Sequence, residues 1–264
     1  MVAERHGGEF ADDRFETATV DRTVAAALGL AGLMLVAIVA RLFIGRKIVA
    51  PWIMTDELIY SELAKSFAEQ GKLLARDQPT VLFSLYPILI APGWLADGVG
   101  SAYAIAKAIN ALLMTLAAVP LYLWARRLVA PGYALLAAAL ALLMPAFLYT
   151  STLMTENAAL PAFVLAFFAF AAALERPSLL NQLLALAAIG LAAAVRIQGV
   201  GLAGVLIVAL ALFAVLEGRA AGKVVSVAEV RRFWPGLASL LVLGLGYLAY
   251  KAAQGEPIES GLGA

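Results

Sequence analysis

The hydrophobic pattern of this chain consists of long apolar runs separated by short polar connections. The first run, residues 23–45 (TVAAALGLAGLMLVAIVARLFIG), is long enough to cross about 30 Å of hydrocarbon as a helix. Further runs of similar character cover residues 102–125, 133–149, 157–174, 179–195, 200–216 and 233–250. The pattern therefore predicts an all-α, polytopic membrane protein with about seven transmembrane helices.

A different pattern follows the first run. Apolar side chains recur every four positions from Ile59 to Phe67, while charged side chains fall outside that stripe. Thr55 suits the N-cap of a helix and Gly71 suits the position after its end. We therefore expect an amphipathic helix that lies in the membrane interface instead of crossing it.

Residues 81–95 (VLFSLYPILIAPGWL) are apolar but are expected not to cross. The segment has about fifteen residues, fewer than the roughly 20 that a span needs, and it contains Pro87 and Pro92. We interpret it as a re-entrant or interfacial segment. It then belongs to a first extracytoplasmic loop of about residues 46–101.

The basic residues of the connections predict the orientation. Those in the short connections are Arg126, Arg127, Arg176, Arg219, Lys223, Arg231 and Arg232. The connection 150–156 (TSTLMTE) has none. Because basic short loops stay in the cytoplasm, the amino terminus is expected there too, and the first loop outside, although Arg46 and Lys47 run against the rule. The predicted location is the inner cell membrane, with an extracytoplasmic active site.

Composition supports a membrane protein and excludes several functions. The chain is 63% hydrophobic, with 14% charged residues and a net charge of +1. No basic surface for nucleic acid is indicated, and the absence of cysteine excludes disulfides and thiolate metal sites. Residues 1–22 are mixed in charge and lack a signal-peptide core, so they predict a disordered cytoplasmic tail before a single transmembrane domain, residues 23–264.

Ionisable residues at the ends of the runs are the candidates for chemistry. In the predicted orientation Asp56, Glu57, Lys107, Glu156 and Arg196 all lie at the outer face. Ionisable groups beside hydrocarbon are costly and commonly mark a site. Structural alternatives remain: acids favour helix N-termini, arginine a helix C-terminus, and a lysine can extend to the surface.

Other polar residues have simpler interpretations. Arg41 is expected to extend its side chain toward the membrane surface. Tyr60 and Tyr86 fit either an interfacial aromatic belt or a substrate site.

Four stretches of sequence resemble a known family: TDELIYSELAKSFAEQGKL, SLYPILIAPGWL, YTSTLMTENAALPAFVLAFFAF and AAVRIQG. Together they resemble the amino-terminal half of GT-C glycosyltransferases, in the branch of protein O-mannosyltransferases and aminoarabinose transferases. The resemblance extends over residues 24–216, and the Asp-Glu pair is its most specific part.

The resemblance implies a hexosyl- or pentosyltransferase that moves a sugar from a polyprenyl-phosphate donor to an extracytoplasmic acceptor. Asp56, with Glu57 beside it, would be catalytic, Asp56 as the general base for the acceptor hydroxyl. Arg196 and Lys107 would hold the lipid phosphate, and Glu57 or Glu156 would orient the acceptor. Tyr60 and Tyr86 complete the expected substrate site. No cofactor and no metal ligand are expected, and a divalent ion is left open.

The sequence departs from the family in two places. No basic residue precedes Pro87 in the stretch 83–86, which leaves the donor open. Relatives have further spans and often an outer domain, so we expect either a longer reading frame or a second subunit to supply them. Membrane lipid and the lipid-linked sugar are the other expected partners.

Two other classes of function remain. A transporter, including a flippase for lipid-linked sugars, would also have many spans, and Pro145 and Pro161 could break two of them. Carriers, however, place their sites near the bilayer midplane, whereas these ionisable residues lie at one face. A structural membrane subunit without chemistry is the third interpretation.

Overall fold

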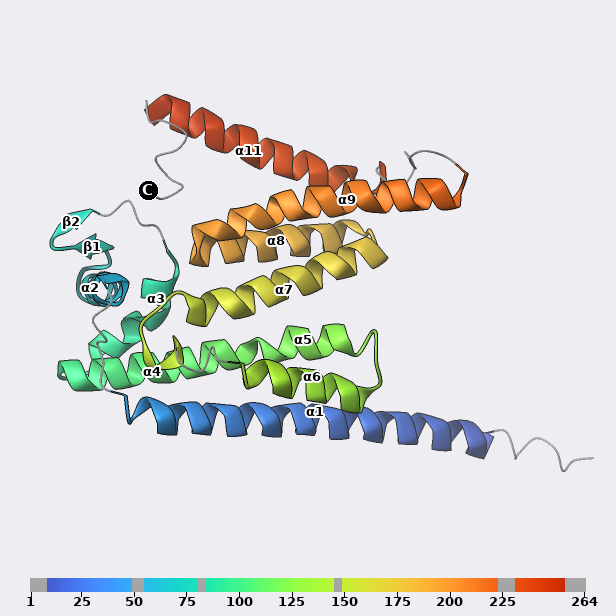
Figure 1. The fold of residues 1–264 in the computed structure, drawn as a ribbon, viewed down its shortest axis with the longest axis horizontal. Coiled ribbons are helices and arrows are strands. Elements are labelled where there is room, and N and C mark those ends of the chain that lie inside the picture. The colour runs from blue at the N-terminus through green and yellow to red at the C-terminus, as the bar shows by residue number, and fades with distance from the viewer. Residues whose placement is uncertain (1–8, 49–54, 80–83, 145–148, 223–230, 255–264) are drawn as a thin grey trace, which may run out of the picture.

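The computed structural model describes residues 9–48, 55–79, 84–144, 149–222 and 231–254. Long helices lie side by side in a stack, from α1 at one edge to α11 at the other (Figure 1). The helices are α1 (Glu9–Gly45), α2 (Thr55–Gln70), α3 (Tyr86–Ile90), η1 (Ala91–Leu95), α4 (Val99–Leu116), α5 (Ala118–Ala125), α6 (Pro131–Leu142), α7 (Glu156–Glu175), α8 (Leu179–Val195), η3 (Ile197–Val200), α9 (Gly201–Ala220) and α11 (Trp234–Gln254).

The membrane-spanning lengths confirm the predicted class of fold. Four helical segments in the described part of the chain are long and apolar enough to cross: Thr23–Gly45, Val99–Ala125, Glu156–Glu175 and Ile197–Ala220. Two further predicted spans are helical but shorter, since α6 has 12 residues and α8 has 17. The chain is thus an all-α membrane protein, and α11, with 21 residues, covers the seventh predicted run, residues 233–250, from Trp234 onward.

The amino-terminal segment differs from its prediction. Helix α1 begins at Glu9, so helical backbone covers most of the segment that the sequence assigned to a disordered tail. The apolar part of the helix still begins at Thr23, as the hydrophobic pattern predicted.

The amphipathic helix after the first span is confirmed as α2. It ends at Gln70, and the following Gly71 has a φ of +68°, a conformation that glycine adopts without steric cost. Leu63 is fully buried against the neighbouring elements, while Glu62 and Lys65 are exposed. A short antiparallel hairpin of β1 (Leu74–Ala75) and β2 (Gln78–Pro79) follows.

The proline-containing segment after the hairpin does not form a span. Helices α3 and η1 have five residues each, so together they reach only about half of the roughly 20 that a crossing needs. Both pack against α2 and α4. A Cβ on Gly93 would lie 2.7 Å from the carbonyl oxygen of Ala102, so glycine is needed for η1 to approach α4 this closely.

Arg41 does not extend to the membrane surface as expected. It is 3% exposed and donates hydrogen bonds to the hydroxyl of Thr115 in α4 and to the carbonyl of Leu142 at the end of α6. That carbonyl belongs to the last turn of α6, where backbone oxygens lack a partner within the helix. Arg41 therefore joins three helices inside the molecule.

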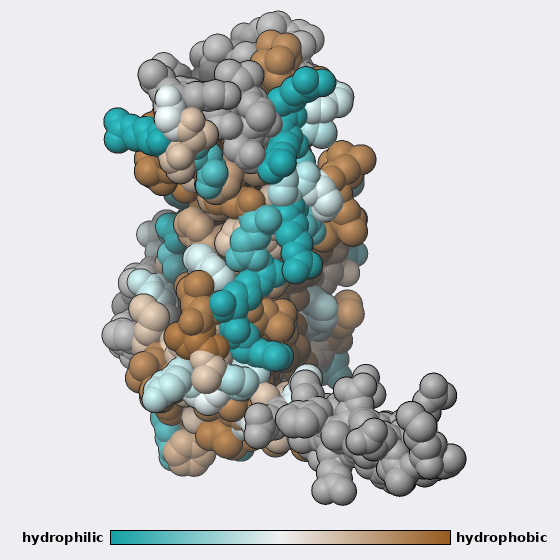
Figure 2. Space-filling view, turned by 90° about the vertical axis from the view of Figure 1, so that its right-hand side faces the viewer, coloured by the Kyte–Doolittle hydropathy of each residue, from teal (hydrophilic) through white to brown (hydrophobic). Residues whose placement is uncertain are grey.

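The two ends of the stack differ in chemistry. One end carries α2, α3 and the hairpin, and the opposite end carries the α5–α6 and α7–α8 connections (Figure 1). Figure 2 faces this opposite end and shows hydrophilic side chains gathered across it, with hydrophobic ones around them. Arg127 pairs there with Glu175 at 2.7 Å. The basic connections and the acidic loop thus lie at opposite ends, as the orientation argument required.

Candidate functional site

Two helix ends meet near α2. The first turn of α7 and the last turn of α8 lie at the end of the stack that carries α2 and α3 (Figure 1). Helices α7 and α8 pack along their lengths through small residues, among them Ala162, Ala166, Ala188 and Ala192. The first residue of α7 therefore faces the residue that follows the end of α8. Those two residues are Glu156 and Arg196.

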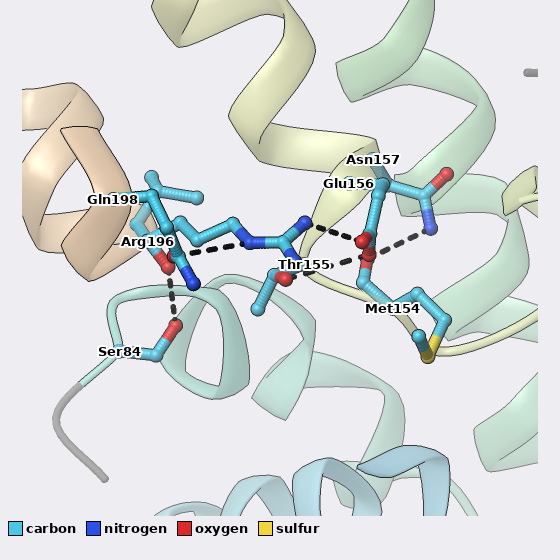
Figure 3. Close-up of polar contacts among 8 residues, drawn as sticks. Ser84, Met154, Thr155, Glu156, Asn157, Arg196 and Gln198 are labelled. Atoms are coloured by element: carbon cyan, nitrogen blue, oxygen red, sulfur yellow. Dashed lines mark hydrogen bonds and ion pairs between the residues drawn. The ribbon is translucent and has the colours of Figure 1, made fainter. Parts of the chain in front are cut away.

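Glu156 and Arg196 form an ion pair across the two helix ends (Figure 3). The guanidinium NH1 donates to Glu156 Oε1, and Nε donates to Gln198 Oε1 at 3.2 Å. The hydroxyl of Thr155 donates to the other carboxylate oxygen at 3.4 Å. The side chains of Arg196 and Glu156 are 38% and 25% exposed, so the pair is accessible from outside the protein.

The backbone around Arg196 is held by the segment that precedes α3. Leu85 N–H donates to the carbonyl of Ala194 at 2.7 Å, and the Ser84 hydroxyl donates to the carbonyl of Val195 at 2.7 Å (Figure 3). These are carbonyls of the last turn of α8, which have no partner in their own helix. The segment therefore fixes the carboxyl end of α8, directly before Arg196.

Gly199 allows the chain to turn back directly after Arg196. A Cβ at this position would lie 2.4 Å from the carbonyl carbon of Ala192, too close for any side chain. The turn η3 therefore rests on the backbone of α8, and Gln198 is brought within reach of the guanidinium.

A network of asparagines fixes the loop that leads to Glu156. Asn157 Nδ2 donates to the carbonyls of Tyr149, Thr152 and Met154 at 2.9–3.1 Å. Asn110 Nδ2, from α4, donates to the same Thr152 carbonyl at 2.9 Å. Asn110, Thr152 and Asn157 are buried, so side-chain amides satisfy backbone oxygens of this irregular loop where water does not reach them.

Tyr86 belongs to this network and not to the surface of the site. It is fully buried, its hydroxyl donates to Asn110 Oδ1 at 2.9 Å, and its ring meets that of Tyr60 edge-on at 5.6 Å. The structure thus gives Tyr86 a packing role where the sequence suggested contact with substrate.

The two adjacent carboxylates of α2 have different environments. Asp56 is exposed, whereas Glu57 is fully buried and accepts a hydrogen bond from the backbone N–H of Leu153 at 3.1 Å. Glu57 thereby ties the first turn of α2 to the loop that precedes Glu156. Of the two predicted catalytic acids, only Asp56 is placed where an external substrate can reach it.

Tyr60, one turn after Asp56 in α2, is influenced by the charges of Asp56 and of the ion pair. Burial raises the pKa of its hydroxyl, and the charges of Asp56 and Glu156 raise it further, while Thr155 and Arg196 act in the opposite direction. The phenol of Tyr60 therefore lies within electrostatic range of Asp56 and of the Glu156–Arg196 pair. Tyr60 is half-buried and meets the ring of Tyr86 edge-on.

Lys107 lies away from this group. Its Nζ donates to the carbonyl of Ile48 at 2.7 Å and to that of Gly45 at 3.3 Å, just after α1. The sequence placed Lys107 at the correct end of the molecule, but the structure directs it toward α1 and not toward Arg196.

A cavity of about 450 Å³ opens directly beside the ion pair. Apart from Glu156, Arg196 and Gln198, its walls are Met114, Tyr149, Ala159, Leu160 and Phe163. The cavity thus combines an ion pair with apolar walls, which suits a molecule that has a polar head and a hydrocarbon body.

Sequence reasoning named Glu156 and Arg196, which the structure brings together, but missed the residues that hold them. The roles of Asn110 and Asn157 could have been anticipated from the sequence, since an amide side chain inside an apolar run must find a hydrogen-bond partner. The roles of Ser84 and Leu153 could not be anticipated, because their partners Val195 and Glu57 lie 111 and 96 residues away in the chain.

Comparison with known proteins identifies the family. The model of the family described as dolichyl-phosphate-mannose-protein mannosyltransferase matches residues 99–247, more than half of the 264-residue chain. The match includes Lys107, Glu156 and Arg196, whereas α2 lies before it. No curated protein and no solved structure matches the chain. The chain therefore belongs to the dolichyl-phosphate-mannose-protein mannosyltransferase family and is a membrane glycosyltransferase of the GT-C kind.

Proposed function

We propose that the chain transfers a sugar from a polyprenyl-phosphate donor to an acceptor hydroxyl on the extracytoplasmic side of the cell membrane. The observation that carries the proposal is the Glu156–Arg196 pair at the mouth of an apolar cavity of about 450 Å³. A lipid phosphate fits this arrangement, because its charged head meets Arg196 and its hydrocarbon meets the wall formed by Leu160 and Phe163.

Arg196 retains hydrogen-bonding capacity for a phosphate. Glu156 uses NH1 and Gln198 uses Nε, and the second terminal nitrogen has no hydrogen-bond partner among the described residues. Glu156 orients the planar guanidinium, which can then bind a phosphate through more than one N–H. Positive charge at this position stabilises the phosphate as it leaves the sugar.

Asp56 is the base in this proposal. The acceptor oxygen forms a bond to the anomeric carbon while the bond from that carbon to the phosphate oxygen breaks. The acceptor proton passes to the Asp56 carboxylate, and the polyprenyl phosphate leaves with the bonding electron pair. Asp56 is exposed at the first turn of α2, where an acceptor arriving from the aqueous side meets it.

The carrier alternative has less support. Family membership favours group transfer, and the polar site lies at one end of the helix stack instead of between its middle sections. Mannose is the sugar to test first, since it is the one in the family description. A second subunit that contributes to acceptor binding remains part of the proposal.

The test uses membranes that contain the full chain and a polyprenyl-phosphate donor with radiolabelled mannose. We expect label to appear in a product that no longer extracts with lipid, and Asp56→Asn to lower its rate by roughly 100-fold. Glu62→Gln is the matched control, because Glu62 is an exposed carboxylate on the same helix, and its rate should stay within about twofold. Transfer from a nucleotide sugar but not from the lipid donor would overturn the proposed donor. Equal rates for Asp56→Asn and the parent would overturn the proposed base.

A further inference from the structure

A second cavity lies between the end of α1 and the beginning of α4. Its volume is about 570 Å³, and it shares no lining residue with the cavity beside Arg196. Its walls come from the end of α1, from Arg46 and Ile48 just after it, and from the part of α4 between Gly100 and Ala108. The transferase proposal makes no use of this space.

The cavity is positively charged. Arg41, Arg46 and Lys107 line it, and none of its lining residues is acidic. Glu57 is close enough to act electrostatically on Lys107, but one carboxylate cannot offset three cations. Lys107 Nζ uses two of its three N–H groups on the carbonyls of Gly45 and Ile48, which leaves one for a ligand among the described contacts.

The position of the cavity along the helices corresponds to lipid headgroups. Arg46 directly follows the apolar span Thr23–Gly45, so it lies where hydrocarbon ends. Arg41 lies about one turn deeper and is held by Thr115 and Leu142. The remaining walls are mostly apolar, with Leu42, Ala104, Ile105 and Ala108 among them. A ligand that fits must have an anionic head and an apolar body.

We propose that this cavity binds the phosphate headgroup of an anionic bilayer phospholipid, as a site separate from the donor site. Basic pockets between transmembrane helices bind phospholipid headgroups on the cytoplasmic side of membranes, and the same chemistry applies here, because Arg46 and Lys107 can both donate hydrogen bonds to phosphate oxygens. The phosphodiester meets Arg46 and Lys107, and an acyl chain lies along the α1–α4 groove. Because Lys107 also binds the carbonyls at the end of α1, the lipid bridges α1 and α4 and stabilises their contact.

The test measures lipid binding and requires no sugar transfer, so its result does not depend on the proposed function. The purified full chain is titrated with phosphatidylglycerol or with phosphatidylcholine of the same acyl chains, and bound lipid is counted by native mass spectrometry. We expect phosphatidylglycerol to bind more tightly. Arg46→Gln should weaken that binding about fivefold, equivalent to about 1 kcal/mol.

Two matched controls separate the cavity from general attraction to charge. Lys47→Gln removes the same charge one residue away, outside the lining, and should leave binding within about twofold. Ala104→Trp fills the cavity without changing any cation and should abolish the tight binding, whereas Leu112→Trp, on an exposed part of the same helix outside the lining, should not.

Three outcomes would overturn the proposal. Equal effects of Arg46→Gln and Lys47→Gln would indicate surface charge alone. Displacement of the lipid by millimolar inorganic phosphate would indicate a site for free anions. Binding of polyprenyl phosphate but not of phosphatidylglycerol would assign the cavity to the donor.

Discussion

The buried carboxylate of Glu57 accepts a hydrogen bond from the backbone N–H of Leu153, a residue 96 positions later in the chain. This bond connects the helix that carries Asp56 to the loop that leads to Glu156. Of the two neighbouring acids of α2, Asp56 is thus exposed, whereas Glu57 holds the helix against the loop.

Replacing Glu57 should destabilise the protein. Glu57→Ala removes the acceptor and leaves the Leu153 N–H buried without it, which costs about 1–3 kcal/mol of unfolding free energy. Glu57→Gln keeps an acceptor oxygen and should cost less. Unfolding in mixed micelles measures the difference, and the exposed Glu62→Ala serves as control, with an expected change within about 0.5 kcal/mol. If Glu57→Ala were as stable as Glu62→Ala, the bond would have no structural importance.

Gly199 should tolerate no side chain. A Cβ there meets the backbone of Ala192 and Ala193 at 2.4 Å, so Gly199→Ala must displace η3 or the end of α8. We expect a loss of stability of about 1–3 kcal/mol together with reduced transfer, because Arg196 lies in the displaced segment. Gly201→Ala is the control, since a Cβ at Gly201 meets nothing within 4 Å. Unfolding and transfer assays on the two variants would contradict the prediction if both behaved alike.

Arg196 should determine affinity for the lipid-phosphate donor. Arg196→Ala should raise the donor KM by about tenfold or more, and Arg196→Lys by less, because lysine keeps the charge but loses the planar set of donors. The acceptor KM should stay unchanged. Arg176→Ala, at the exposed opposite end of α7, should leave both constants near those of the parent. An unchanged donor KM in Arg196→Ala would leave Arg196 as a helix-end residue only.

The orientation can be tested with single cysteines, since the chain contains none. Gln78 lies in the exposed hairpin after α2, and Ala221 is exposed after α9 at the other end. A membrane-impermeant maleimide should label Gln78→Cys in intact cells and Ala221→Cys only after lysis. The reverse pattern would place the site in the cytoplasm.

The sequence predicted those elements whose signals are local. Helix α8 has the predicted ends, Leu179 and Val195, because Ser178 caps it and the chain leaves helical geometry at Arg196. The end of α2 was marked by Gly71 in the same way. Hydrophobic length likewise predicted the four full spans.

The direction of individual side chains could not be predicted, because it depends on distant partners. Arg41 is buried because Thr115 and Leu142 supply oxygens 74 and 101 positions away. Lys107 turns toward α1 because the carbonyl of Ile48, 59 positions earlier, accepts from it. Helical periodicity gives the face on which a residue lies, but not what that face meets.

The two hydrogen bonds from Ser84 and Leu85 to the end of α8 have a mechanical consequence. The first loop, which carries Asp56, is attached through them to the backbone that presents Arg196. Any displacement of residues 84 and 85 must either move Arg196 or break both bonds, at a cost of about 1–3 kcal/mol in total. In the proposed reaction, an acceptor that displaces this loop would also displace Arg196, so acceptor binding and donor binding would be mechanically coupled.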